Sequence, residues 1–284
     1  MKHREITEKI LADDPMWVCP PARVPLDVFK YGNPEDECTG VVCTISSTVN
    51  VIRQAAEAGC NLIIAHENAF YIDTDEYDWL RGNEVFEEKA ALLDKHGITL
   101  WRYHDHMHRH RPDKMFTGIT RELGWKDYHI GDSTPNNGIM QQYMLPEKVK
   151  LGDFAQEMKE KFLMNGLQVI GNLDAEVQKV GMLYHIFFAL NMGDKSMSTE
   201  KVHTVDVWDG QFDVLLSIET LDWTVLSYVR DAAELGKPIG LLAIGHFNLE
   251  NLGMRYMANT WLPKLLNNEV PVKFINAGDL FQYM

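Results

Sequence analysis

The sequence predicts an α/β protein of two lobes, each with a mostly parallel sheet and helices packed on it. Along the chain, apolar runs of strand length alternate with longer amphipathic runs of helix length. Strands separated by helices in this way are typical of parallel strands joined by right-handed crossovers. The length of 284 residues is long for one compact core, and a less regular middle separates two regular ends.

The first part of the chain contains three predicted strands, each followed by a helix. The strands are expected at 40–45, 61–65 and 98–103, and the helices at 47–58, 84–96 and 114–123. Ser47 is the expected N-cap of the first helix, and glycines at 59, 97 and 124 are the expected stops.

The rest of the chain begins less regularly and then returns to the same alternation. Asp153 is the expected N-cap of an amphipathic helix that ends at Gly166. Further strands are expected at 167–171, 177–184, 214–218, 239–244 and 270–275, and further helices at 224–235 and 248–266.

Composition and charge exclude several functions. With 27 basic and 41 acidic residues the formal charge is −14, which argues against binding nucleic acid through a basic patch. No apolar run reaches the roughly 18–20 residues of a membrane span, and no signal peptide is visible. The four cysteines form no CxxC pair, so we expect reduced thiols in a cytoplasmic protein.

Three histidines each follow a predicted apolar strand. His66 follows NLIIA, His104 follows ITLWRY, and His246 follows IGLLAI after a single glycine. The carboxyl ends of parallel strands meet at one edge of a sheet, where ligands bind. We therefore expect these three side chains to lie close together.

Each of these histidines has a companion that could bind the same ion. The candidate metal ligands are His66, Glu67, His104, His108, His246 and Glu250. The first two are adjacent, and each later pair is four residues apart, which puts its members on one face of a helix, as in helical zinc sites. Six ligands are more than one tetrahedral ion uses, so we predict a pair of divalent ions.

The alternative for each histidine alone is an ordinary hydrogen-bonded or exposed side chain, and the run HDHMHRH alone could be a solvated loop. The occurrence of three such clusters at equivalent strand ends favours metal binding.

Four segments, in this order, resemble the NIF-three-like dinuclear metal proteins, often named GTP cyclohydrolase 1 type 2 homologues. The segments are STVNVIRQAAEAGCNLIIAHENAFY, GITLWRYHDHMH with GITRELGW, FDVLLSIET, and GHFNLENLGMRYMANTWLPKLL. The resemblance implies two α/β lobes with the metal site in the inter-lobe cleft, commonly assembled as a hexamer. Residues 1–128 together with 236–284 would form the first lobe, which carries the metal ligands, and residues 129–235 the second, more variable lobe.

Four candidate ligands match the family's pattern. By resemblance, His66 is the first histidine of the family's HH pair, and His104 is the histidine of its HTxxD motif. His246 and Glu250 match its GHxxxE motif, and Glu250 is the expected bridging carboxylate.

Two other candidate ligands depart from the family. Glu67 stands where the second histidine would be, and His108 stands at the metal-binding aspartate, so the resulting N/O ligand set suits zinc, iron or manganese. Glu67 could instead be the bridge, and Asp105 could replace His108. The family's glycine-rich turn is missing, since GMLYHIFFAL stands there, so the substrate pocket is expected to differ.

The resemblance implies a metal-dependent hydrolase whose bound water attacks a nucleotide or another small phosphorylated or heterocyclic compound, with GTP as the named possibility. Glu67 and Asp105 are the candidate catalytic residues, because either could move the proton. The alternatives are a metal-binding scaffold without catalysis, in which protein ligands would close the coordination sphere, and a protein-interaction module.

Overall fold

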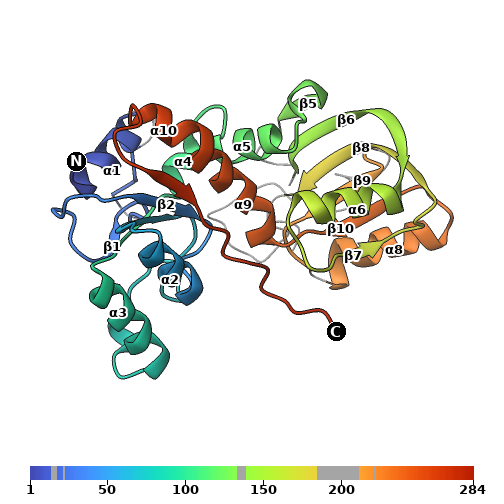
Figure 1. The fold of residues 1–284 in the computed structure, drawn as a ribbon. Coiled ribbons are helices and arrows are strands. Elements are labelled where there is room, and N and C mark those ends of the chain that lie inside the picture. The colour runs from blue at the N-terminus through green and yellow to red at the C-terminus, as the bar shows by residue number, and fades with distance from the viewer. Residues whose placement is uncertain (14–17, 22, 133–138, 184–210, 221) are drawn as a thin grey trace. The chain divides into compact units, whose positions relative to one another are not determined.

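The computed structural model describes residues 1–13, 18–21, 23–132, 139–183, 211–220 and 222–284 (Figure 1). They form two compact units, the first made of Met1–Glu122 with Glu250–Gly278 and the second of Leu123–Leu249 with Asp279–Met284. Each unit is a β-sheet with helices, so the predicted α/β fold class is confirmed. Most of the segment GMLYHIFFAL, from residue 184 onward, lies outside the described residues.

The sheet of the first unit has five strands in the order β1–β4–β3–β2–β11. Its central strands are buried along their whole length, as expected of parallel strands covered on both faces. β11, β2, β3 and β4 are parallel, and β1 pairs antiparallel with β4. The strands are β1 (Phe29–Tyr31), β2 (Val41–Thr44), β3 (Leu62–Ala65), β4 (Thr99–Arg102) and β11 (Val272–Phe274).

Helices cover both faces of this sheet (Figure 1). Apolar side chains of α2 and α3 form one core cluster with β2, β3 and β4, and a π-helical turn, Met257–Trp261, lies against β2 and β11. The helices of the first unit are α1 (His3–Ala12), α2 (Val49–Glu57), a 3₁₀ turn (Asp78–Leu80), α3 (Glu84–His96), α4 (Asp105–Arg109), α5 (Lys114–Glu122) and α10 (Leu262–Leu265).

The ends of α3 match the prediction, and the start of α2 does not. The Asn83 side chain accepts from the Phe86 N–H at the start of α3, and Gly97 ends the helix with φ of 59°. The N-cap of α2 is Thr48, whose hydroxyl accepts from the Val51 N–H at 3.2 Å, so the assignment of Ser47 was wrong by one residue.

The second unit contains a six-stranded sheet in the order β5–β6–β8–β9–β10–β7. Among its described strands, β8, β9 and β10 are parallel and the other neighbours are antiparallel. The prediction of a mostly parallel sheet is therefore wrong for this unit, because three of the five neighbour pairs are antiparallel. The strands are β5 (His129–Asp132), β6 (Ile139–Lys150), β7 (Gln168–Ile170), β8 (Glu176–Leu183), β9 (Val214–Ser217) and β10 (Gly240–Ala243). The helical segments are a 3₁₀ turn (Lys126–Tyr128), α6 (Leu151–Lys161), a π-helical turn (Asp222–Leu226) and α8 (Ser227–Glu234).

The N-cap of helix α6 lies three residues before Asp153, the residue predicted to cap it. Its N-cap is Lys150, and Asp153 lies in the first turn. The N–H groups of Leu151 and Gly152 donate to the backbone carbonyls of Ala175 and Leu173, at 2.8 and 2.9 Å. The helix therefore needs no side-chain cap at its start.

Helix α9 (His246–Tyr256) crosses the boundary between the two units and continues through the π-helical turn into α10. Within the first unit it packs closely on α5, since a Cβ built on Gly118 would lie 3.0 Å from the Cα of Gly253. Arg255 and Glu122 form an ion pair at 2.6 Å between the same two helices. These contacts fix the part of α9 that carries Glu250.

All four cysteines are free thiols, with Cys43 and Cys60 buried. None of the helices in the described ranges is long and apolar enough to cross a membrane.

Candidate metal centre

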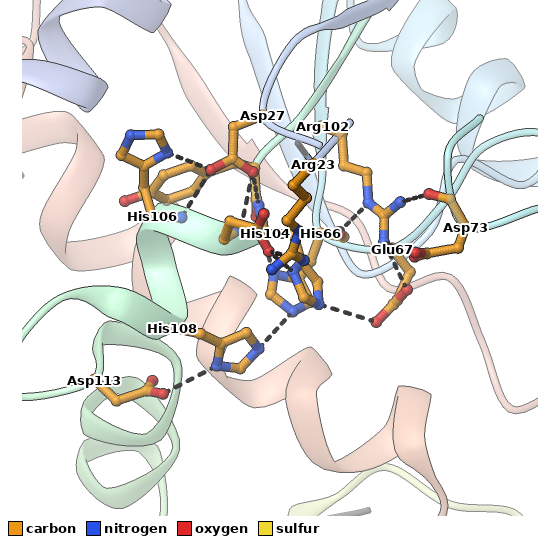
Figure 2. A network of polar contacts seen from close by, with 12 residues as sticks. Arg23, Asp27, His66, Glu67, Asp73, Arg102, His104, His106, His108 and Asp113 are labelled. Atoms are coloured by element: carbon orange, nitrogen blue, oxygen red, sulfur yellow. Dashed lines mark hydrogen bonds and ion pairs between the residues drawn. The ribbon is translucent and has the colours of Figure 1, made fainter. Parts of the chain in front are cut away.

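Three predicted histidine ligands converge in the first unit (Figure 2). His66 follows β3, His104 follows β4, and His108 lies on α4. One ring nitrogen from each lies within 4.8 Å of the other two. The Nε2 atoms of His66 and His108 are only 3.1 Å apart.

Each of these imidazoles has an acceptor at Nδ1. For His66, His104 and His108 in turn, the acceptors are the carbonyl oxygen of Tyr103 at 2.9 Å, Asp105 Oδ1 at 3.0 Å and Asp113 Oδ2 at 3.0 Å. An acceptor at Nδ1 favours the tautomer with its proton there and leaves the Nε2 lone pair available for a metal ion. The arrangement is that of histidine ligands held from behind by carboxylates and a carbonyl.

Because both Nδ1 atoms face acceptors, the two Nε2 atoms at 3.1 Å need a proton or a metal cation between their lone pairs. Burial lowers the pKa of His66 well below its usual value, and His104 acts in the same direction. Burial also acts to lower the pKa of His108, but Asp113 and Glu250 outweigh it and raise that pKa to about 9. A proton on His108 can bridge the two nitrogens, and a divalent cation fits the same donors with more ligands.

Two glutamates contribute carboxylates to the cluster. Glu250 Oε2 lies 3.5 Å from His66 Nε2, and its Oε1 lies 3.8 Å from His108 Nε2. Glu67 Oε1 lies 4.0 Å from His104 Nε2. His66, Glu67 and Glu250 form a second group that could hold an ion.

The two groups share His66, and one imidazole nitrogen binds a single ion. Two ions would therefore need the carboxylates, which have two oxygens each, to complete both coordination spheres. Glu250 already directs its two oxygens at two different histidines, as a bridging ligand would.

His246 is the first residue of α9, one turn before Glu250. It is partly exposed and belongs to the second unit, whereas Glu250 belongs to the first. The spacing puts both side chains on one face of α9. That His246 binds the same metal remains a prediction.

Asp105, a predicted catalytic residue, lies behind His104. Its Oδ1 contacts His104 Nδ1 at 3.0 Å and accepts from Arg23 Nη2 at 2.9 Å. Because Nδ1 and Nε2 are on opposite sides of the imidazole ring, the position of Asp105 suits orientation of His104.

Asp27 organises the HDHMHRH segment and is not evident from the sequence. Its buried carboxylate accepts from the backbone N–H groups of His104, Asp105 and His106 at 2.5, 2.9 and 2.7 Å, and from the His106 ring at 2.5 Å. Burial acts to raise the pKa of Asp27, but these bonds outweigh it and the pKa is lowered. Asp27 lies 77 residues before His104, so the only sequence signal is an isolated acidic residue.

Comparisons with known proteins agree with this fold. The sequence profile of Duf34/NIF3 (NGG1p interacting factor 3) matches residues 24–184. A search of curated proteins found no significant match. At the identities given below, the similarity to solved structures shows the fold alone. One is Staphylococcus aureus protein SA1388, with 16% sequence identity, coverage of 100% of this chain and 99% of that chain, and a TM-score of 0.70. A Bacillus cereus protein related to NIF3 has 12% identity, coverage of 100% of this chain and 99% of that chain, and a TM-score of 0.69. Reduced HcgD from Methanocaldococcus jannaschii has 14% identity, coverage of 97% of each chain, and a TM-score of 0.62.

Proposed function

The chain belongs to the Duf34/NIF3 family, and on this premise we propose that it is a hydrolase dependent on two divalent metal ions. The proposed ligands are His66, Glu67, His104, His108, His246 and Glu250. The observation that carries the proposal is the convergence of three imidazoles, with one ring nitrogen from each within 4.8 Å of the other two, whose Nδ1 atoms all have acceptors. Zinc, iron and manganese all suit this mixed set of nitrogen and oxygen donors.

Ions in such a site supply a water nucleophile at neutral pH and stabilise negative charge on the substrate. Where its carboxylate is not bound to an ion, Glu67 is the candidate proton-transfer residue, because that carboxylate faces His104 and its side chain is 11% exposed. Asp105 is assigned the orientation of His104. This assignment gives the two predicted catalytic carboxylates different roles.

The proposed substrate is a nucleotide or another small phosphorylated or heterocyclic compound, with GTP as one candidate. Two cations attract oxyanions, and the formal charge of −14 makes the rest of the chain a poor competitor for them. Arg23, which is 40% exposed and bound to Asp105, is a cation near His104.

The proposed assembly is a homohexamer in the cytoplasm. Family resemblance supports the hexamer, and four free thiols suit a reducing compartment. Light scattering coupled to size-exclusion chromatography measures the assembly, and a monomer throughout the micromolar range would count against it.

The test of catalysis is turnover of a panel of nucleotides, phosphoesters and cyclic amides by the zinc-, manganese- and iron-loaded protein. We expect at least one substrate to react, and Glu67→Gln to abolish the reaction while some metal remains bound. Asp36→Asn, which alters an exposed carboxylate of the same unit, is the matched control.

Phosphate gives a second readout. It should raise the melting temperature of the metal-loaded protein and leave that of the metal-free protein unchanged, because only open coordination positions bind it. Metal occupancy with no turnover and no phosphate effect would mean a binding scaffold in place of a hydrolase.

A further inference from the structure

Arg102 is a buried cation directly behind the metal-ligand cluster. It is the last residue of β4, two positions before His104, and its side chain is 2% exposed. A buried guanidinium is costly unless nearly all of its N–H groups find acceptors. The hydrogen-bond acceptors of Arg102 therefore indicate what this side chain holds in place.

The acceptors of Arg102 include both residues of the first ligand pair. Nε donates to the backbone carbonyl of His66 at 3.1 Å, and Nη2 donates to Glu67 Oε2 at 3.4 Å (Figure 2). Glu67 Oε1 is the oxygen that faces His104 Nε2 at 4.0 Å. One oxygen of Glu67 is thus held by Arg102, and the other faces His104.

The guanidinium is itself fixed by the loop that follows Glu67. Nη1 donates to the carbonyl of Asp73 and lies 3.6 Å from Asp75 Oδ2. Asp75 is fully buried, and its Oδ1 accepts from the N–H groups of Ala69 and Phe70 at 2.6 and 2.9 Å. Arg102 therefore cannot follow Glu67 if that side chain turns.

A second buried cation supports the same loop. Lys30 donates to the carbonyl of Thr74 at 3.2 Å and lies 3.9 Å from Asp75 Oδ2. The loop after β3 is thus anchored to β1 as well as to β4. This anchoring gives the loop one defined position relative to the histidines.

We propose that Arg102 is a positioning residue that holds Glu67 Oε2 and so presents Oε1 to a metal ion. The inference rests on the proposed metal centre and adds a residue that determines how its glutamate ligand is used. A guanidinium suits this role better than an ammonium, because its planar donors reach His66, Asp73 and Glu67 in fixed directions.

The test is zinc titration of the metal-free protein, by calorimetry or against a chromophoric chelator, with folding checked by circular dichroism. The wild type is expected to bind two ions in two steps. Arg102→Lys should weaken one step by about 10- to 100-fold, the usual effect of removing a group that orients a ligand, and leave the other within about threefold. Glu67→Gln should weaken the same step, and the double variant should match Glu67→Gln alone.

Asp73→Asn is the matched control. The Asp73 carboxylate contacts the same Nη2 at 3.4 Å, but its side chain is 78% exposed, so its removal should leave both steps unchanged. A purely structural role for Arg102 would weaken both steps alike, and that result would overturn the proposal. So would wild-type affinity in Arg102→Lys, or a further loss in the double variant.

Two further outcomes are distinguishable. A wild type that binds no zinc refutes the metal centre itself, whereas two normal steps in both wild type and Arg102→Lys refute only the role of Arg102. If Arg102→Lys does not fold, a crystal structure of the zinc-loaded wild type decides. Glu67 Oε2 on Arg102 with Oε1 on the ion supports the proposal, and loss of the Arg102 contact overturns it.

Discussion

Replacing Asp27 by Asn tests whether the carboxylate behind the HDHMHRH segment fixes the histidines. Asparagine keeps the size of the side chain and one oxygen, which can still accept from the N–H groups of His104 and Asp105. Its NH₂ group replaces the oxygen that accepts from the His106 backbone at 2.7 Å and from its ring at 2.5 Å. The NH₂ group then faces the backbone N–H of His106, also a donor, and the ring keeps its contact only by moving its proton away from Nδ1.

The expected cost follows from these contacts. A hydrogen bond to a charged group contributes about 1.5–3 kcal/mol, and a buried unpaired N–H costs about 1–3 kcal/mol, so with partial relaxation we expect about 3 kcal/mol. In a unit of about 150 residues, each kcal/mol lowers the melting temperature by roughly 2–4 °C, so the shift should be roughly 6–12 °C.

Scanning calorimetry of the metal-free protein at pH 7 measures this shift in the transition of the first unit. Asp36→Asn, on an exposed loop, should cost about 0.5 kcal/mol or less. Zinc affinity of Asp27→Asn should also fall about tenfold, because His104 loses its fixed backbone position. A melting temperature within about 2 °C of the wild type, together with unchanged zinc affinity, would refute this view of Asp27.

Three further variants test separate features. Asp113→Asn should lower zinc affinity by about 10- to 100-fold with little change in folding, as measured by calorimetric titration. Lys89 is buried, and burial lowers its pKa to about 8 from 10.5, so its folded form binds fewer protons than its unfolded form between these values. Urea unfolding measures the free energy of unfolding of the wild type and of Lys89→Met. The difference between the two should grow by about 3 kcal/mol in favour of the wild type as pH rises from 8 to 10.5. A difference that does not change with pH would contradict a lowered pKa for Lys89. Gly253→Ala should cost about 1–3 kcal/mol, because its Cβ would lie 2.9 Å from the Met115 carbonyl oxygen, whereas Gly131→Ala, with open space around it, should be nearly neutral in the same assay.

Much of the first unit could be predicted because its elements carry strong local signals. Buried apolar runs define β2, β3 and β4, and Gly97 in the left-handed conformation ends α3 at the expected residue. The proximity of His66 and His104 could also be predicted, because each follows a parallel strand and such strands end at one edge of the sheet.

The second unit was harder to predict, because its strands are defined more by hydrogen bonding to neighbouring strands than by the local pattern of apolar residues. β6 contains Pro146 and has a register irregularity between Met144 and Val149. Its antiparallel pairing with β5 needs no helix-length connection between the two strands to mark it. Polar residues along the strand further obscure its apolar alternation.

The groups that orient the predicted ligands were also beyond sequence reasoning. Asp27 and Arg102 act across 77 and 35 positions on His104 and Glu67, and neither belongs to a motif. Local spacing identifies ligands that share a helix or flank a strand, whereas the residues that hold them depend on tertiary packing.

Anomalous diffraction at the zinc edge, from crystals of the zinc-loaded protein, tests the metal centre most directly. We predict strong peaks about 2.0–2.1 Å from the Nε2 atoms of His66, His104 and His108, with Glu67 and Glu250 oxygens in the same coordination spheres. Peaks confined to other surface histidines, or none at this cluster under saturating zinc, would contradict the assignment of this site.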